Sequence, residues 1–167
     1  RSIGLLFKRK NTPIEPIIFG GGQELGLRSG TENLPSIAGF ARALEIATLE
    51  RNDQFQKVIG LRDYFIQGLK SIRKDITING DDGAHKSPHI LNVQIPKIDN
   101  EFFVLQLDSK GIACSTKSSC LGDEEESYVL NAIGANSKES VRFSFGRYTT
   151  ISDIKKALRI IAKVLVK

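Results

Sequence analysis

The spacing of apolar residues changes near residue 76, and this change constrains the fold more than any other feature of the sequence. Between residues 34 and 72, apolar residues recur at helical spacing in two stretches that meet at the charged segment Glu50-Arg51-Asn52-Asp53. We expect two helices there, or one long bent helix. Beyond residue 76, short strand patterns alternate with helix patterns, which predicts an α/β fold.

Short strands are expected in five segments, which are residues 3–7, 76–78, 90–95, 112–114 and 141–145. The first of these reads as a buried strand, because all of its residues except one glycine are apolar. In the last segment, the alternation places Arg142 on the face opposite Val141, Phe143 and Phe145.

Local capping signals bound the helices. Asn33 followed by Leu34-Pro35 is a helix start with proline in the first turn. Asp99 or Asn100 caps a helix that stops at Gly111, and residues 128–133 form a short helix. The segment Thr150-Ile151-Ser152-Asp153 is a capping box for the last helix.

The length of 167 residues fits one globular domain, or one domain that carries a piece of another. We place a boundary near residue 51, between a piece comprising residues 1–50 and an α/β domain comprising residues 51–167. The first residue is Arg and the sequence contains no Met, so we expect a processed chain or part of a longer one. No apolar run approaches the roughly 20 residues of a membrane span, which predicts a soluble protein without a membrane partner.

Charge and metal-ligand patterns exclude several function classes. The formal charge of +5 comes from 24 basic and 19 acidic residues that are interspersed, and the one basic cluster, Lys8-Arg9-Lys10, lacks neighbouring aromatic residues. We therefore expect no nucleic-acid partner. Pro88 denies His85 and His89 a shared helical face, and the spacing of the two cysteines matches no common zinc pattern, so no metal site is expected.

Cys120 is the main candidate for chemistry. It lies among small polar residues between Ser115 and Gly122, which predicts an accessible loop, whereas Cys114 ends an apolar segment and reads as a buried spectator. Lys117 favours a Cys120 thiolate and the acidic run at residues 123–126 opposes it, so the pKa stays open. Two cysteines in a chain of this length fit a reducing compartment.

Two further residues suit the binding of anions. Arg142 offers a planar fork to a carboxylate, although a solvated charge at a sheet edge is an equal alternative. Thr31 precedes a helix N-terminus, where a hydroxyl and free amides could hold a phosphate, although ordinary capping is the simpler reading.

The motifs of the chain, in the order in which they occur, resemble those of a cysteine desulfurase of the NifS/IscS type. Such a protein is a class V aminotransferase-family enzyme with pyridoxal phosphate as cofactor. The matching segments are Gly20-Gly21-Gly22-Gln23-Glu24, Leu27-Arg28-Ser29-Gly30-Thr31-Glu32-Asn33-Leu34-Pro35, Leu91-Asn92-Val93, residues 111–120, Ser127-Tyr128-Val129-Leu130, and residues 141–150. The resemblance implies the C-terminal part of the aspartate aminotransferase-like fold. Residues 1–50 would then end the large cofactor-binding domain, and residues 51–167 would form the small α+β domain with the cysteine loop.

The resemblance also implies a role for each candidate residue. Cys120 matches the cysteine that takes sulfur from L-cysteine as a persulfide and leaves L-alanine. Arg142 matches the arginine that holds the substrate carboxylate, and Thr31 matches the threonine that reaches the cofactor phosphate across a homodimer interface. The sulfur would pass to an acceptor or iron–sulfur scaffold protein, in the cytoplasm or, in a eukaryote, the mitochondrial matrix.

The departures from the family pattern leave alternatives open. Family members carry the cofactor lysine in a Ser-x-His-Lys motif upstream of the segment that matches residues 1–4, and Lys8, Lys10 and Lys110 lack its context. The chain could therefore be a catalytically incomplete sulfur carrier or interaction module. A selenocysteine lyase-like relative, or one acting on cysteine sulfinate, is also compatible with the motifs. Cys114 replaces a small residue, which leaves a disulfide or persulfide relay with Cys120 as a further alternative.

Overall fold

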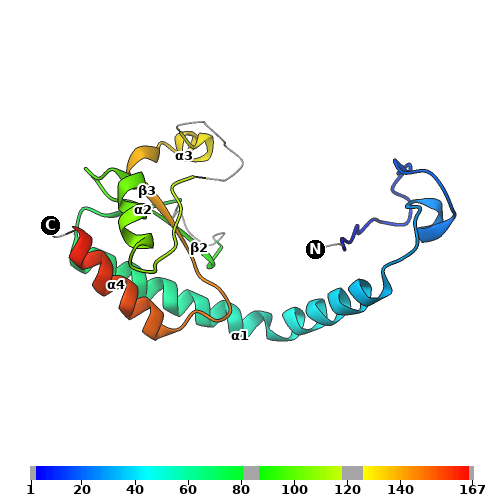
Figure 1. The fold of residues 1–167 in the computed structure, drawn as a ribbon, viewed down its shortest axis with the longest axis horizontal. Coiled ribbons are helices and arrows are strands. Elements are labelled where there is room, and N and C mark those ends of the chain that lie inside the picture. Colours follow the sequence, from blue (N-terminus) through cyan, green and yellow to red (C-terminus); the bar gives the residue numbers. More distant parts are fainter. Residues whose placement is uncertain (1–2, 81–86, 118–125, 166–167) are drawn as a thin grey trace. The chain divides into compact units, whose positions relative to one another are not determined.

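The structure is a computed structural model that describes residues 3–80, 87–117 and 126–165. The chain divides into two units, an N-terminal unit of residues Arg1–Arg51 and a C-terminal unit of residues Asn52–Lys167 (Figure 1). Helix α1 (Leu34–Ile72) contributes to both. Among the described helices, none is long and apolar enough to cross a membrane.

The N-terminal unit contains the 3-10 helix η1 (Gln23–Gly26) and the first half of α1. The strand predicted over residues 3–7 is wrong, because this segment has no regular secondary structure and exposes Leu5, Leu6 and Phe7. A strand is stable only when its backbone groups pair with a neighbour. No strand is found in the part of this unit that the structure describes, so the apolar segment has nothing to pair with there.

Helix α1 is continuous across the charged segment at residues 50–53, so the prediction of one long helix is confirmed. It begins as expected, because Asn33 Oδ1 accepts a hydrogen bond of 3.1 Å from the Ser36 amide. Its second half carries the buried residues of the C-terminal unit, among them Val58, Phe65 and Leu69.

The C-terminal unit is built on a three-stranded antiparallel sheet in the order β1 (Thr77–Asn79), β2 (Ile90–Gln94), β3 (Ser140–Ser144). One face is apolar, with Leu91 and Val93 of β2 opposite Phe143 and Val141 of β3. The alternation predicted for residues 90–95 and 141–145 is therefore confirmed. Residues 112–114 do not form the predicted strand, and this segment pairs with the sheet only through the bridge from Ser115 to Arg142.

Helices α2 (Asn100–Asp108) and α4 (Ile151–Leu165) share the hydrophobic core with α1 and the apolar face of the sheet. In Figure 1, α4 (red) lies along the C-terminal half of α1. Gly68 of α1 allows this approach, since a Cβ there would lie 3.0 Å from Leu158 Cγ. The Phe65 ring meets the rings of Phe143 and Phe145 edge to face, with centroids 5.0 and 5.8 Å apart.

The predicted helix starts are confirmed in the C-terminal unit. Asp99 Oδ1 accepts from the Phe102 amide at 2.9 Å and caps α2. The capping box of α4 is complete, because the Thr150 amide donates to Asp153 Oδ2 at 2.9 Å and the Asp153 amide donates to Thr150 Oγ1 at 3.2 Å. Along the chain, the short helix α3 (Tyr128–Ala132) and the 3-10 helix η3 (Ser137–Glu139) lie between α2 and α4.

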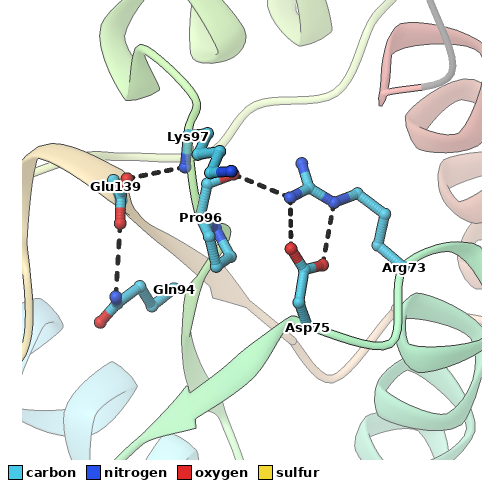
Figure 2. A network of polar contacts seen from close by, with 6 residues as sticks. All are labelled: Arg73, Asp75, Gln94, Pro96, Lys97 and Glu139. Atoms are coloured by element: carbon cyan, nitrogen blue, oxygen red, sulfur yellow. Dashed lines mark hydrogen bonds and ion pairs between the residues drawn. The ribbon is translucent and has the colours of Figure 1, made fainter.

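A polar network ties the end of α1 to the turn after β2 (Figure 2). Arg73 donates to both carboxylate oxygens of Asp75, at 3.0 and 2.6 Å, and to the Pro96 carbonyl at 2.8 Å. Glu139 accepts from the Lys97 amide at 2.7 Å, where Lys97 has a positive φ of 61°. These bonds hold the backbone that leads from the sheet into α2.

Candidate functional site

The face of the sheet opposite the core carries a row of polar side chains. Asn79 of β1 pairs with Asn92 of β2, which in turn pairs with Arg142 of β3. All three are only half-buried. The sheet therefore places Arg142, the predicted carboxylate-binding residue, beside two amides.

Arg142 is held by its backbone on the outer side of β3. Its amide donates to the Ser115 carbonyl at 2.7 Å, and its carbonyl accepts from the Ser115 amide at 3.1 Å. Because a residue in a strand directs both backbone groups to the same side, Arg142 and Asn92 form a non-hydrogen-bonded pair, in which side chains approach most closely. The Arg142 guanidinium has no hydrogen bond or ion pair with any residue that the structure describes.

A chain of hydrogen bonds fixes the amides in this row. Ser140 Oγ, on a fully buried residue, donates to the Asn136 carbonyl at 2.6 Å. Asn79 Nδ2 donates to Ser140 Oγ at 2.9 Å and to Asn92 Oδ1 at 2.6 Å. Sequence reasoning missed Asn79 and Asn92 as site residues. The available signal for Asn92 was its place between Leu91 and Val93, which mirrors that of Arg142 between Val141 and Phe143.

Cys114 lies at the edge of the core and is half-buried, which agrees with its interpretation as a spectator. Burial raises the pKa of its thiol to about 11, and the nearby Asp108 carboxylate adds to the rise. At neutral pH the group is a thiol, which is a poor nucleophile. Cys120 lies outside the described residues, as does the part of its predicted loop from residue 118 to residue 125.

Thr31 is exposed, and its hydroxyl has no hydrogen bond to another described residue. The helix start that follows is capped by Asn33 rather than by Thr31. The Leu34 amide donates to the Glu32 carbonyl, and Pro35 has no amide to offer. The first turn of α1 therefore has few free amides for an anion that the Thr31 hydroxyl could bind.

The C-terminal unit contains two cavities among the described residues. The larger, of about 580 Å³, is lined mainly by polar residues around the start of α2, together with Thr116 and Lys117. The smaller, of about 240 Å³, lies between the end of β3 and the start of α4. Arg142 is not among the lining residues of either cavity.

A protein-family model described as aminotransferase class-V matches residues 3–157. The chain belongs to the class-V aminotransferase family. Three relatives of this class-V chain bear the name cysteine desulfurase IscS. That of Dictyoglomus turgidum is 35% identical over all of this chain and 43% of its own length, and that of Photorhabdus laumondii is 40% identical over 96% of this chain and 40% of its own. The first IscS of Archaeoglobus fulgidus is 36% identical over 99% of this chain and 44% of its own.

Two solved structures share the fold of this class-V chain. A NifS-like protein matches 95% of this chain with a TM-score of 0.79 and 33% identity, over 40% of its own chain. A NifS-like protein from Rickettsia africae matches 94% with a TM-score of 0.79 and 28% identity, over 41% of its own chain. The predicted resemblance and the α/β fold class are thus confirmed. The chain spans less than half the length of the curated relatives it matches.

Proposed function

We propose that this chain belongs to a longer pyridoxal phosphate-dependent cysteine desulfurase, which takes sulfur from L-cysteine and releases L-alanine. Its similarity to relatives of that name along its whole length supports the proposal. The N-terminal unit would end the large cofactor-binding domain, and the C-terminal unit would be the small domain that carries the cysteine loop. The sulfur would pass to an acceptor or iron–sulfur scaffold protein, and the enzyme would be a homodimer.

The pairing of Ser115 with Arg142 is the observation that carries the proposal. Ser115 begins the segment that leads to Cys120, and its two backbone hydrogen bonds hold the start of this segment beside Arg142. Five residue steps separate Ser115 from Cys120, and a fully extended chain covers at most about 18 Å over that length. A substrate whose carboxylate is bound by Arg142 is therefore within reach of the proposed nucleophile.

The proposed reaction transfers one sulfur atom. The Cys120 thiolate attacks the sulfur of the substrate cysteine, so that an S–S bond forms and the C–S bond of the substrate breaks. The electron pair of the broken bond stays on the substrate carbon, which then takes up a proton to give alanine. Cys120 is left as a persulfide, ready to pass its outer sulfur to a thiolate of the acceptor.

Arg142 would hold the substrate while this happens. A guanidinium binds a carboxylate through two parallel hydrogen bonds and so fixes its orientation. The neighbouring Asn79 and Asn92 amides add no negative charge that would compete for the guanidinium. The polar row is therefore suited to bind the carboxylate of an amino acid.

Among the described residues, Thr31 is the candidate to hold the cofactor, at its phosphate end. The exposed Thr31 hydroxyl suits a phosphate oxygen. Lys8 lacks the sequence context of the family's cofactor lysine, and its Nζ already donates to the carbonyls of Lys10 and Thr12, at 3.3 and 3.4 Å. When bound, pyridoxal phosphate supplies an electron sink for the pair left on the substrate carbon.

The test is to incubate the full-length protein with L-cysteine and pyridoxal phosphate and to measure alanine and sulfide. We expect stoichiometric alanine from the unaltered protein and from Cys114→Ala, the matched control, and none from Cys120→Ala. Full activity of Cys120→Ala would refute Cys120 as the nucleophile. Acceptance of sulfur from a donor without alanine formation would favour the sulfur carrier, and faster turnover of selenocysteine or cysteine sulfinate would favour a different substrate.

A further inference from the structure

We propose that Asn92 is a second substrate-binding residue, whose side-chain Nδ2 group donates a hydrogen bond to the same carboxylate as Arg142. The proposal rests on the proposed function, because it takes the ligand of Arg142 to be the carboxylate of an amino acid. It follows from the orientation of the Asn92 amide, which the surrounding hydrogen bonds determine.

The orientation can be traced from a main-chain group whose role is unambiguous. The Asn136 carbonyl can only accept a hydrogen bond, so the single hydroxyl proton of Ser140 Oγ is donated to it, at 2.6 Å. Ser140 Oγ must then accept from Asn79, and the Asn79 atom 2.9 Å away is therefore Nδ2. The second proton of Asn79 Nδ2 points to Asn92 at 2.6 Å, so the atom of Asn92 that receives it is Oδ1.

This assignment leaves Asn92 Nδ2 on the branch of the amide turned away from Asn79. Its two protons have no acceptor among the residues that the structure describes. Arg142 is the cross-strand neighbour of Asn92 on the side away from Asn79, in a non-hydrogen-bonded pair where Cβ atoms are about 4.5–5.5 Å apart. A guanidinium has no acceptor for an amide proton, so the two groups cannot satisfy each other.

Asn92 Nδ2 and the Arg142 guanidinium therefore form a set of donors that has no acceptor among the described residues. A carboxylate has two oxygens and can take the fork of Arg142 and one bond from Asn92 at the same time. Asn79 would not touch the ligand and acts as a positioning residue, because it keeps Oδ1 of Asn92 turned away from the site. The buried Ser140 in turn fixes Asn79.

The test compares variants of the full-length holoenzyme by KM and kcat for L-cysteine, and by the Kd of radiolabelled L-alanine from equilibrium dialysis. For Asn92→Ala we expect KM and Kd to rise about tenfold or more, as for loss of a hydrogen bond to a charged group, with kcat nearly unchanged. Asn92→Asp keeps the side-chain volume and the bond from Asn79, and its new charge should raise both constants further. Asn79→Ala should have a smaller effect, about threefold, since both Asn92 protons remain.

Arg142→Gln separates the two proposals. If it weakens alanine binding while Asn92→Ala and Asn92→Asp do not, the role of Asn92 is overturned and the proposed function stands. If none of the three variants changes alanine binding, the carboxylate site at Arg142 is itself refuted. Equal losses of alanine binding in Asn79→Ala and Asn92→Ala would mean that Asn92 acts only through the structure of the sheet, which also overturns the proposal.

Discussion

Helices α1 and α4 approach closely at Gly68. We predict that Gly68→Ala destabilises the chain when Leu158 is present and stabilises it when Leu158 is replaced by alanine. A Cβ at Gly68 would lie 2.7 Å from Leu158 Cδ2 and 3.0 Å from Cγ, with Cδ1 closer still. These separations are shorter than carbon atoms tolerate, so Gly68→Ala must displace the Leu158 side chain. Overpacking of this kind costs about 1–3 kcal/mol, against a gain of about 1 kcal/mol from the higher helix propensity of alanine. We expect a net loss of about 1 kcal/mol.

Leu158→Ala removes the atoms that Gly68→Ala would strike. Leu158→Ala alone should lower the unfolding free energy by about 2 kcal/mol. This is at the low end of the range for leucine-to-alanine substitutions, because the Leu158 side chain is only partly buried. In the Leu158→Ala background, Gly68→Ala should stabilise the chain by about 1 kcal/mol, since only the gain in helix propensity remains. The coupling energy between the two positions is then about 2 kcal/mol.

The assay is urea unfolding of the four chains of this double-mutant cycle, followed by circular dichroism. Gly60 of the same helix is the matched control, because a Cβ there would meet nothing within 4 Å. Gly60→Ala should stabilise both backgrounds equally. If Gly68→Ala shifts the urea midpoint in the same direction with and without Leu158, the packing argument is refuted.

Three further outcomes follow from the structure. Thr150→Ala should lower the unfolding free energy by about 1 kcal/mol at pH 7. The hydrogen bonds from Thr150 lower the pKa of Asp153, so the difference in unfolding free energy between the variant and the unaltered chain should shrink as pH falls through that pKa. Acid unfolding curves of the two chains measure this. The pKa of the Cys114 thiol is raised to about 11, so only about one part in a thousand should be thiolate at pH 8. We expect the thiol to resist iodoacetamide until the chain unfolds. Its contribution to the unfolding free energy should be lost as pH rises towards 11. Glu139→Ala should cost about 1–3 kcal/mol in urea unfolding, because the Lys97 amide loses its charged acceptor.

Much of the C-terminal unit could be predicted from local signals. The Asp99 cap and the Thr150 capping box involve residues three positions apart, so the sequence alone indicates them. Alternation identified β2 and β3 and placed Arg142 opposite the core, because side chains in a strand point to alternating faces. These features depend on the chain near each residue and not on the rest of the fold.

Features that depend on distant partners could not be predicted. Residues 3–7 have the composition of a strand, but composition does not supply the neighbouring strand that pairing requires. The pairing of Asn79 with Asn92 depends on strand register, which joins residues 13 positions apart. The bond from Asn79 to Ser140 spans 61 positions. The candidate residue Arg142 could therefore be identified from the sequence, whereas the hydrogen bonds among the amides beside it could not.

The most direct test of the account is to locate the transferred sulfur. The full-length protein would be incubated with L-cysteine carrying labelled sulfur, trapped with an alkylating agent and digested for mass spectrometry. We predict one labelled sulfur on the peptide that contains Cys120, none on the peptide that contains Cys114, and one alanine per persulfide formed. Label on Cys114 instead, or alanine formation without a persulfide on Cys120, would contradict the account.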